Sequence, residues 1–201
     1  MISVCIATHN GEKYIKEQLD SILCQLAPDD EVVISDDGSS DRTLDIISDY
    51  NDQRLKIYHF KQPLITSHSH IYVAHNFENA LVKASGDYIF LCDQDDIWHS
   101  DKVKKCIEQL NQYDLVVHNF RLMDEFGVWL GKNLLVCGNI YYGCSIAFKR
   151  SFIDMVIPFP KYLLLHDYWI GAIIQMIGTM TYIDEPLMDY RYREESVSHA
   201  P

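Results

Sequence analysis

Hydrophobic residues form near-continuous runs at four places in the first half of the chain, and amphipathic segments separate these runs. Such runs are typical of strands that are buried on both faces of a sheet. The runs cover residues 2–8, 31–37, 54–60 and 87–92. The segments with apolar side chains at helical spacing are residues 11–26, 40–51 and 74–85. Strands and helices that alternate at this spacing predict an α/β fold, with a mostly parallel sheet flanked by helices.

The pattern changes after one more amphipathic segment at residues 102–112. The remaining chain predicts a strand–turn–strand unit, a strand that opens into a short helix, an apolar helix and a final strand with its extension. These elements are residues 114–131, 142–151, 166–178 and 179–193. Residues 61–75, which contain one proline and three histidines, are expected to form a mobile loop. We find no internal repeat or clear linker, so residues 1–201 are expected to form one domain.

Composition and charge narrow the class of protein. Hydrophobic residues make up 48% of the chain and charged residues 23%, as in ordinary soluble globular proteins. The net charge of −12, which no basic stretch offsets, argues against nucleic acid as a partner. This charge does not exclude a phosphorylated ligand, because a bound metal ion can supply positive charge locally.

The cysteines and the apolar runs indicate a compartment. None of the six cysteines forms a C-x-x-C pair, and several lie inside apolar runs, which favours buried reduced thiols over disulfides or zinc. The first ten residues do not resemble a signal peptide, and no apolar run approaches the roughly 20 residues of a membrane span. A reducing, cytoplasmic location is the expectation.

Polar clusters follow three of the predicted strands at the point where each strand ends. In an open parallel sheet, ligands collect at the carboxyl ends of the strands, so these clusters are expected to share one rim. A single acidic run is most often a solvated turn, but three runs at equivalent strand ends point to a common site. The members are Thr8, His9 and Asn10; Asp36 and Asp37; and Asp93, Gln94, Asp95 and Asp96.

The acidic run at Asp93 also suits a divalent cation. The first and third residues of an extended D-x-D segment point the same way, so Asp93 and Asp95 can face one ligand. Oxygen ligands favour Mg²⁺ or Mn²⁺ over zinc. An EF-hand loop is excluded, because Trp98 occupies the position where that loop requires glycine.

Four segments resemble the inverting family 2 glycosyltransferases, and they follow the family's order over nearly the whole chain. They read IATHNGEKYIKEQLDSIL, VVISDDGSSDRT, GDYIFLCDQDDIWHSDKV and HDYWIG. The likeness is to bacterial members of the rhamnosyltransferase-like and polysaccharide-building type. It implies the GT-A fold, a Rossmann-like, mostly parallel sheet flanked by helices with a small antiparallel acceptor-side sheet. Residues 1–112 then form the nucleotide-binding half and residues 113–201 the acceptor-side half.

The resemblance assigns roles at the acidic run. It implies that Asp95 is the main metal ligand and that Asp93 contacts the ribose or a water on the metal. Asp96 is the extra acid of a D-x-D-D variant. Trp98 is expected to pack under this loop, and Lys102 to be a cation on the face of a helix in preference to a phosphate contact.

The resemblance also assigns the nucleotide's base to the ends of the first two strands. Asp36 and Asp37 match the family's aspartate pair, with Asp37 as the member that reads the base. Thr8, His9 and Asn10 match the segment usually written T-Y-N, so His9 replaces a tyrosine. An imidazole can also stack on a base, although its face is smaller.

Asp167, in the segment HDYW, is carried over as the catalytic base. An inverting transfer is one displacement, in which a carboxylate takes the proton of the attacking hydroxyl. The alternative role for Asp167 is to cap the helix that it begins. Gly143 resembles the family's glycine beside the donor sugar, where the backbone must come close to a ligand, and a plain turn is the alternative.

The end of the chain departs from the family's pattern. Relatives often carry a histidine where Arg193 stands. An arginine cannot bind a metal, but Arg193, and in the same way Arg191, can hold a phosphate in a bidentate manner. His199 is a more distant substitute ligand. Relatives also often continue with a helical segment, so the sequence is expected to be either a minimal catalytic domain or a truncated one.

The resulting hypothesis is a metal-dependent inverting glycosyltransferase that uses Mn²⁺ or Mg²⁺. It would move a sugar from a UDP- or dTDP-sugar to a glycan or lipid-linked acceptor in bacterial surface polysaccharide synthesis. The resemblance leaves open a peripheral position on the inner face of the plasma membrane. Two alternatives remain. A non-catalytic nucleotide-sugar-binding protein would keep the same acids. A sugar-nucleotide nucleotidyltransferase is disfavoured, because that class needs a glycine-rich loop directly after the first strand, and this loop contains only Gly11.

Overall fold

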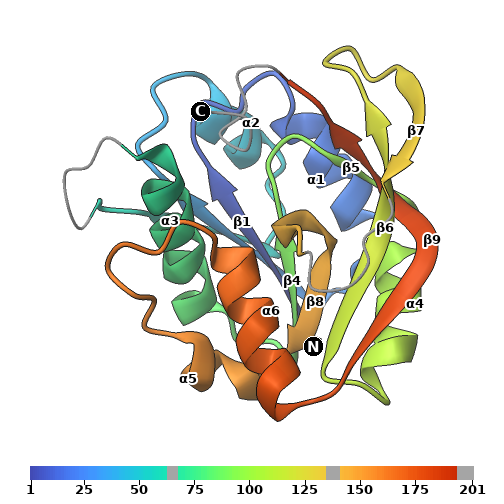
Figure 1. Ribbon diagram of the computed structural model, residues 1–201. Coiled ribbons are helices and arrows are strands. Elements are labelled where there is room, and N and C mark those ends of the chain that lie inside the picture. The colour runs from blue at the N-terminus through green and yellow to red at the C-terminus, as the bar shows by residue number, and fades with distance from the viewer. Residues whose placement is uncertain (63–67, 135–140, 194–201) are drawn as a thin grey trace.

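The computed structural model describes residues 1–62, 68–134 and 141–193. One sheet runs through the described chain, in the order β3-β2-β1-β4-β8-β6-β9-β5, and β7 pairs with β6 (Figure 1). The strands are β1 Ile2–Thr8, β2 Glu31–Asp36, β3 Leu55–His59, β4 Tyr88–Cys92, β5 Ile97–Trp98, β6 Leu115–Met123, β7 Trp129–Leu134, β8 Ile146–Lys149 and β9 Met180–Arg191. The helices are α1 Ile15–Leu23, α2 Thr43–Asp49, α3 Ser69–Lys83, α4 Lys102–Leu110, α5 Ile153–Val156 and α6 His166–Ile177.

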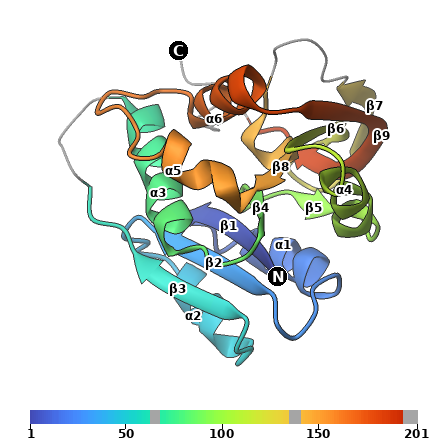
Figure 2. The same cartoon turned by 90° about the horizontal axis from the view of Figure 1, so that it is seen from below.

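The first four of these strands, β3, β2, β1 and β4, are parallel. Helices α1, α2 and α4 lie on one side of the sheet, and α3, α5 and α6 lie on the other (Figure 2). Because β1 and β2 are covered on both faces, their apolar side chains, such as Val4 and Val33, have no exposed surface. The predicted α/β fold with a mostly parallel sheet and helical flanks is confirmed.

The predicted antiparallel strands extend this same sheet. Strand β8 runs antiparallel to both β4 and β6, and so joins the two halves of the chain. Strand β9 lies between β6, with which it pairs in parallel, and the short antiparallel strand β5, which the apolar pattern does not predict. The pairing with β5 brings the end of β9 next to the acidic loop that follows β4, because Ile97 of β5 lies opposite Asp189.

Two predicted segments differ from the structure. Helix α3 begins at Ser69, inside the stretch predicted to be a loop, because Ile71, Ala74 and Phe77 face the core from its first turns. Residues 63–67 of that loop lie outside the described residues. The segment predicted as a strand from residue 142 begins with a 3₁₀ turn at Gly143–Ser145 before β8 starts.

The cysteines agree with the prediction of reduced thiols as far as they are described. Cys5, Cys92, Cys106 and Cys144 are free and buried, and Cys24 is free and exposed. Cys137 lies outside the described residues. Within the described ranges, no helix is both long and apolar enough to cross a membrane.

Candidate active site

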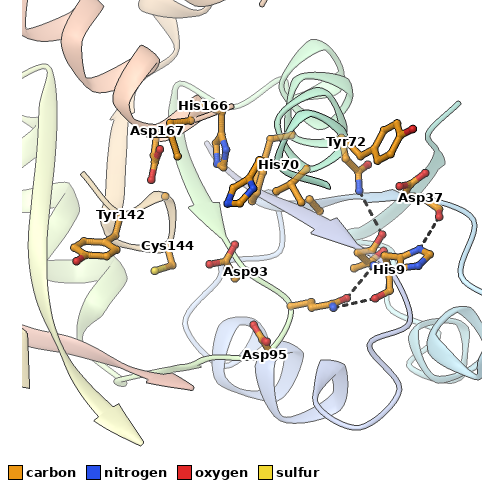
Figure 3. A pocket seen from close by; sticks show the side chains of 18 of the residues that line it. His9, Asp37, His70, Tyr72, Asp93, Asp95, Tyr142, Cys144, His166 and Asp167 are labelled. Atoms are coloured by element: carbon orange, nitrogen blue, oxygen red, sulfur yellow. Dashed lines mark hydrogen bonds between the residues drawn. The ribbon is translucent and has the colours of Figure 1, made fainter. Parts of the chain in front are cut away.

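The register of the parallel strands brings the predicted polar clusters to one edge of the sheet. Thr8 at the end of β1 pairs with Asp36 at the end of β2, and Ile6 pairs with Cys92 at the end of β4. The loops that follow these strands line a cavity of about 600 Å³, together with α3 and the start of α6. In Figure 3, Asp93 lies at the centre, with His9 and Asp37 on one side and Asp167 on the other.

At one end of the cavity, the turn after β1 is held against the acidic loop. Nε2 of Gln94 donates to the carbonyl of His9, and the amide of His9 donates back to Oε1 of Gln94, both at 3.0 Å. Nδ1 of His9 lies 2.8 Å from the carbonyl oxygen of Asp37 (Figure 3). Asn10 adopts a positive φ of 48°, and its Oδ1 accepts from the amide of Ser40. These contacts hold His9, Asn10 and Asp37, three of the residues predicted to bind the base, on the wall of the cavity.

The two aspartates after β2 have different surroundings. Asp37 lines the cavity, and its carboxylate accepts from Nε2 of Gln62. Asp36 is fully buried and does not line the cavity. Its carboxylate accepts from Oγ1 of Thr8 at 3.0 Å and from the amide and hydroxyl of Ser39. Asp36 therefore supports the turn, whereas Asp37 is the member that a ligand can reach.

The acidic loop holds its carboxyl groups in an environment that opposes their ionisation. Burial, with the charges of Asp95 and Asp167, raises the pKa of Asp93 to about 7. Burial also raises the pKa of Asp95, against the opposing effect of Arg193. Burial and the other two carboxylates raise the pKa of Asp96 well above its usual range. Like charges held this close favour a bound cation.

A divalent cation fits this loop. Asp93, Asp96 and Cys144 each offer a ligand atom, and these atoms lie within 4.8 Å of one another. Oδ2 of Asp96 is buried and has no hydrogen-bond partner among the described residues. A carboxylate oxygen in this position needs a partner, and oxygen donors suit Mn²⁺ and Mg²⁺. The predicted main ligand, Asp95, is ion-paired with Arg193 in this structure.

The two arginines at the end of β9 play different parts. Arg193 lines the cavity. Arg191 is 3% exposed and does not line it. Its guanidinium donates to the carbonyl oxygens of Asp95 and Glu125 and to the carboxylate of Glu17. The phosphate-binding role expected of Arg191 therefore has no support in the geometry, because its donors are used within the fold. His199 lies outside the described residues.

Lys102 is buried, and the expectation of a cation on an exposed helix face is wrong. The side chain is 1% exposed, and its Nζ donates to the carbonyl of Cys144 at 2.8 Å and lies 4.0 Å from the centre of the Trp98 ring. Burial lowers the pKa of Lys102. The sequence carried a signal for this position, because Lys102 lies on the same helical stripe as Cys106 and Leu110, which are both buried.

Asp167 occupies the first turn of α6 and lines the cavity. Its Oδ1 accepts from the amide of Tyr168 at 2.8 Å, and no cation is paired with it among the described residues. Gly143 also lines the cavity, and a Cβ built there would lie 3.0 Å from Nε2 of His166. The turn before β8 and the start of α6 therefore pack closely, and a larger residue at this position would require His166 to shift.

Several cavity residues carried no signal that the sequence analysis recognised. They come mainly from α3, whose residues before Ala74 were predicted as a loop, and from the turn before β8. They are His70, Tyr72, Asn76, Phe77, Tyr141, Tyr142, Cys144 and His166. A helix predicted to begin at residue 69 would have included His70 and Tyr72.

The chain belongs to the glycosyl transferase family 2, whose model matches residues 3–152. It is similar to the dTDP-rhamnosyl transferase RfbG of Shigella flexneri, with 29% identity over 218 residues that cover 95% of this chain and 72% of the relative. The predicted family is thus confirmed. A nucleotidyltransferase is disfavoured accordingly.

Solved structures of the same architecture support the GT-A fold. The chain superposes on S. aureus TarS 1–349 in complex with UDP-GlcNAc with a TM-score of 0.77 and 21% identity, covering 100% of this chain and 61% of that one. It superposes on the mannosyltransferase PcManGT from Pyrobaculum calidifontis, in complex with GDP-Man and Mn²⁺, with a TM-score of 0.76 and 22% identity, covering 98% of this chain and 58% of that one. The chain spans about three fifths of the length of these proteins and of several curated relatives.

Proposed function

We propose that the protein transfers a sugar from a nucleoside diphosphate sugar to a glycan or lipid-linked acceptor, with inversion and with the aid of Mn²⁺ or Mg²⁺. The observation that carries the proposal is the single cavity lined by the acidic loop at Asp93 and by Asp167. A volume of about 600 Å³ suits a ligand of nucleotide-sugar size. The solved neighbours that bind UDP-GlcNAc or GDP-Man with Mn²⁺ support this reading.

The nucleotide's base belongs at the end of the cavity formed by the turns after β1 and β2. Asp37 offers carboxylate oxygens that can accept from a base N–H, and His9 offers a ring face beside it. A pyrimidine nucleotide, UDP or dTDP, is the donor that we propose. The likeness to the dTDP-rhamnosyl transferase RfbG favours this class.

The diphosphate belongs near Asp93, Asp95 and Arg193. Asp93 would hold the cation together with the unpartnered Oδ2 of Asp96, and Asp95 would join them once its ion pair with Arg193 opens. The cation, when bound, neutralises the charge that develops on the leaving diphosphate. Arg193 lines the same wall and adds a guanidinium that matches phosphate oxygens in a bidentate manner. Exchange of the Arg193–Asp95 ion pair for a phosphate contact would free Asp95 for the cation.

Asp167 is the base in this proposal. The acceptor hydroxyl must lose its proton as its oxygen attacks the anomeric carbon, and a carboxylate within hydrogen-bond reach can take that proton. The bond to the diphosphate breaks on the opposite face, so the configuration of the sugar inverts. The acceptor would be a glycan or a lipid-linked saccharide of bacterial surface polysaccharide synthesis, reached from the cytoplasmic side of the membrane.

The replacement Asp167→Asn tests the assignment, because it preserves shape and removes the base. We expect turnover to fall by at least about 100-fold, whereas donor affinity measured by calorimetry stays within about twofold. A matched control is Asp154→Asn, which changes an aspartate on α5 that does not line the cavity. Loss of donor binding in Asp167→Asn would reassign the residue to the binding site. Donor binding without turnover in the wild type would favour the non-catalytic alternative.

A further inference from the structure

His166, the first residue of α6, carries a ring nitrogen that the fold leaves unused. The residue is 9% exposed and lines the cavity. Its Nε2 is buried and has no hydrogen-bond partner among the described residues. A buried nitrogen without a partner costs free energy, and folded proteins pair nearly all such groups. His75, by comparison, is equally buried, and its two ring nitrogens contact Glu78 and the carbonyl of Lys161.

The ring of His166 is held in one position. It stacks on Phe77, with ring centres 4.3 Å apart and an angle of 20° between the planes. Gly143 lies close to Nε2, since a Cβ built on that glycine would come to 3.0 Å from the nitrogen. Figure 3 places the ring between Asp167 and His70, on the side of Asp167 that faces the nucleotide end of the cavity. A ring fixed in this way can select the orientation of a bound group.

The chemistry of the ring indicates what it would bind. Burial lowers the pKa of His166, and the charge of Asp167 does not outweigh this effect, so the imidazole is neutral near pH 7. A neutral imidazole offers one donor and one acceptor. This pair matches a sugar hydroxyl, which also donates and accepts, whereas a phosphate would use only the donor.

We propose that His166 determines sugar recognition, by a hydrogen bond between its imidazole and a hydroxyl of the sugar carried by the donor. The inference rests on the proposed function, since a sugar linked to the diphosphate near Asp93 must extend toward Asp167. In Figure 3, His166 lies beside Asp167, on the side toward the nucleotide end of the cavity. It is therefore a substrate contact beside the base and takes no proton from the acceptor.

The test compares each nucleotide with its sugar conjugate. Binding of UDP, dTDP and GDP, and of UDP-glucose, UDP-GlcNAc, dTDP-rhamnose and GDP-mannose, is measured by calorimetry with Mn²⁺. The variant is His166→Phe, which keeps the stacking on Phe77 and removes both nitrogens. We expect the gain in affinity that the preferred sugar provides to fall about 5- to 30-fold, whereas affinity for the parent nucleotide stays within about twofold. The control is His118→Phe, because the Nε2 of His118 is also buried and without a partner among the described residues, but His118 does not line the cavity.

Four results would overturn the inference. The first is that the sugar increases affinity as much in His166→Phe as in the wild type, and the second is that nucleotide and nucleotide sugar lose affinity equally. The third is that the variant raises only the KM for the acceptor. The fourth is that no sugar increases the affinity of the wild type. If the wild type binds no nucleotide at all, the proposed function fails first and the inference fails with it.

A second measurement does not depend on a variant that folds. In the wild type labelled with ¹⁵N-histidine, the ring resonances of His166 should shift on addition of the preferred nucleotide sugar and stay in place with the nucleotide alone. A ring that responds equally to both would contradict the proposal.

Discussion

Arg191 and Arg193 lie two residues apart at the end of β9, and their guanidinium groups have different surroundings. The guanidinium of Arg191 donates to two carbonyl oxygens and one carboxylate, and its Cζ lies 4.6 Å from the centre of the Tyr14 ring. Arg193 contacts the carboxylate of Asp95 from the cavity side. A sequence pattern cannot separate the two, because residues two apart on a strand share a face. They differ here because β9 ends at Arg191 and Arg193 follows it.

Arg193 gives a prediction in which two affinities move in opposite directions. In Arg193→Ala, donor affinity should fall about tenfold or more, because charge-assisted hydrogen bonds to phosphate are lost. Affinity for Mn²⁺ alone should rise, because Asp95 loses the cation that now pairs with it. Calorimetry with Mn²⁺ and with each donor measures both changes. Arg121→Ala is the control, since Arg121 pairs with Asp189 and does not line the cavity. If both affinities stayed unchanged, Arg193 would have no role in the site.

At the scale of elements, one carboxylate ties together the ends of the strands opposite the cavity. Glu31, the first residue of β2, accepts from the hydroxyl of Ser3 on β1 and from the amide and hydroxyl of Ser85 before β4. It also pairs with Lys56 on β3. Burial opposes the ionisation of Glu31, but these hydrogen bonds prevail and lower its pKa to about 2. Glu31 thus ties β2 to its two neighbours, β1 and β3, and to the segment before β4, at the edge of the sheet away from the cavity.

The sign of the resulting pH dependence follows from that shift. A pKa below the ordinary value of 4.5 means that ionised Glu31 stabilises the fold above pH 4.5, and this contribution is lost as the pH falls toward 2. Glu31→Gln should lower the free energy of unfolding at pH 7 by about 1–3 kcal/mol and flatten its decline between pH 4.5 and pH 2. Urea denaturation at several pH values measures both. Glu108→Gln, at an exposed position on α4, should change neither. An unaltered acid profile in Glu31→Gln would rule out the assignment.

The elements also indicate what a single sequence can predict. The buried strands β1, β2 and β4 are nearly continuous apolar runs, so their positions follow from the pattern. The start of α3 does not, because its first residues, Ser69 and His70, are polar and directly follow another polar stretch, so the helical pattern becomes clear only from Ala74. Strand β5 is two residues long, and its pairing with β9 depends on the path of a segment 90 residues later. Whether a strand as short as β5 forms therefore depends on pairing with a distant segment, which the local pattern does not contain.

At the scale of the whole molecule, the cavity forms between segments that are far apart in the chain. The meeting of the loops after β1, β2 and β4 can be predicted, because the carboxyl ends of parallel strands lie at one edge of the sheet. No rule of sheet topology predicts that Asp167 lies near Asp93, and only the resemblance to a family indicates it. The structure brings the two close enough for the charge of Asp167 to contribute to the raised pKa of Asp93. Strand β8 makes this possible, because it joins the second half of the chain to β4.

A ligand that spans this cavity should therefore contact both the ends of β1 and β2 and the start of α6. We expect a nucleotide such as UDP to slow amide exchange at the ends of β1 and β2, where His9 and Asp37 lie. The corresponding nucleotide sugar, with Mn²⁺, should also slow exchange in the first turns of α6, because the sugar extends toward Asp167. Hydrogen exchange read by mass spectrometry compares the two complexes, with α2, which does not line the cavity, as the internal control. Protection of α6 by the nucleotide alone would mean that the base and the sugar occupy the cavity in the opposite order.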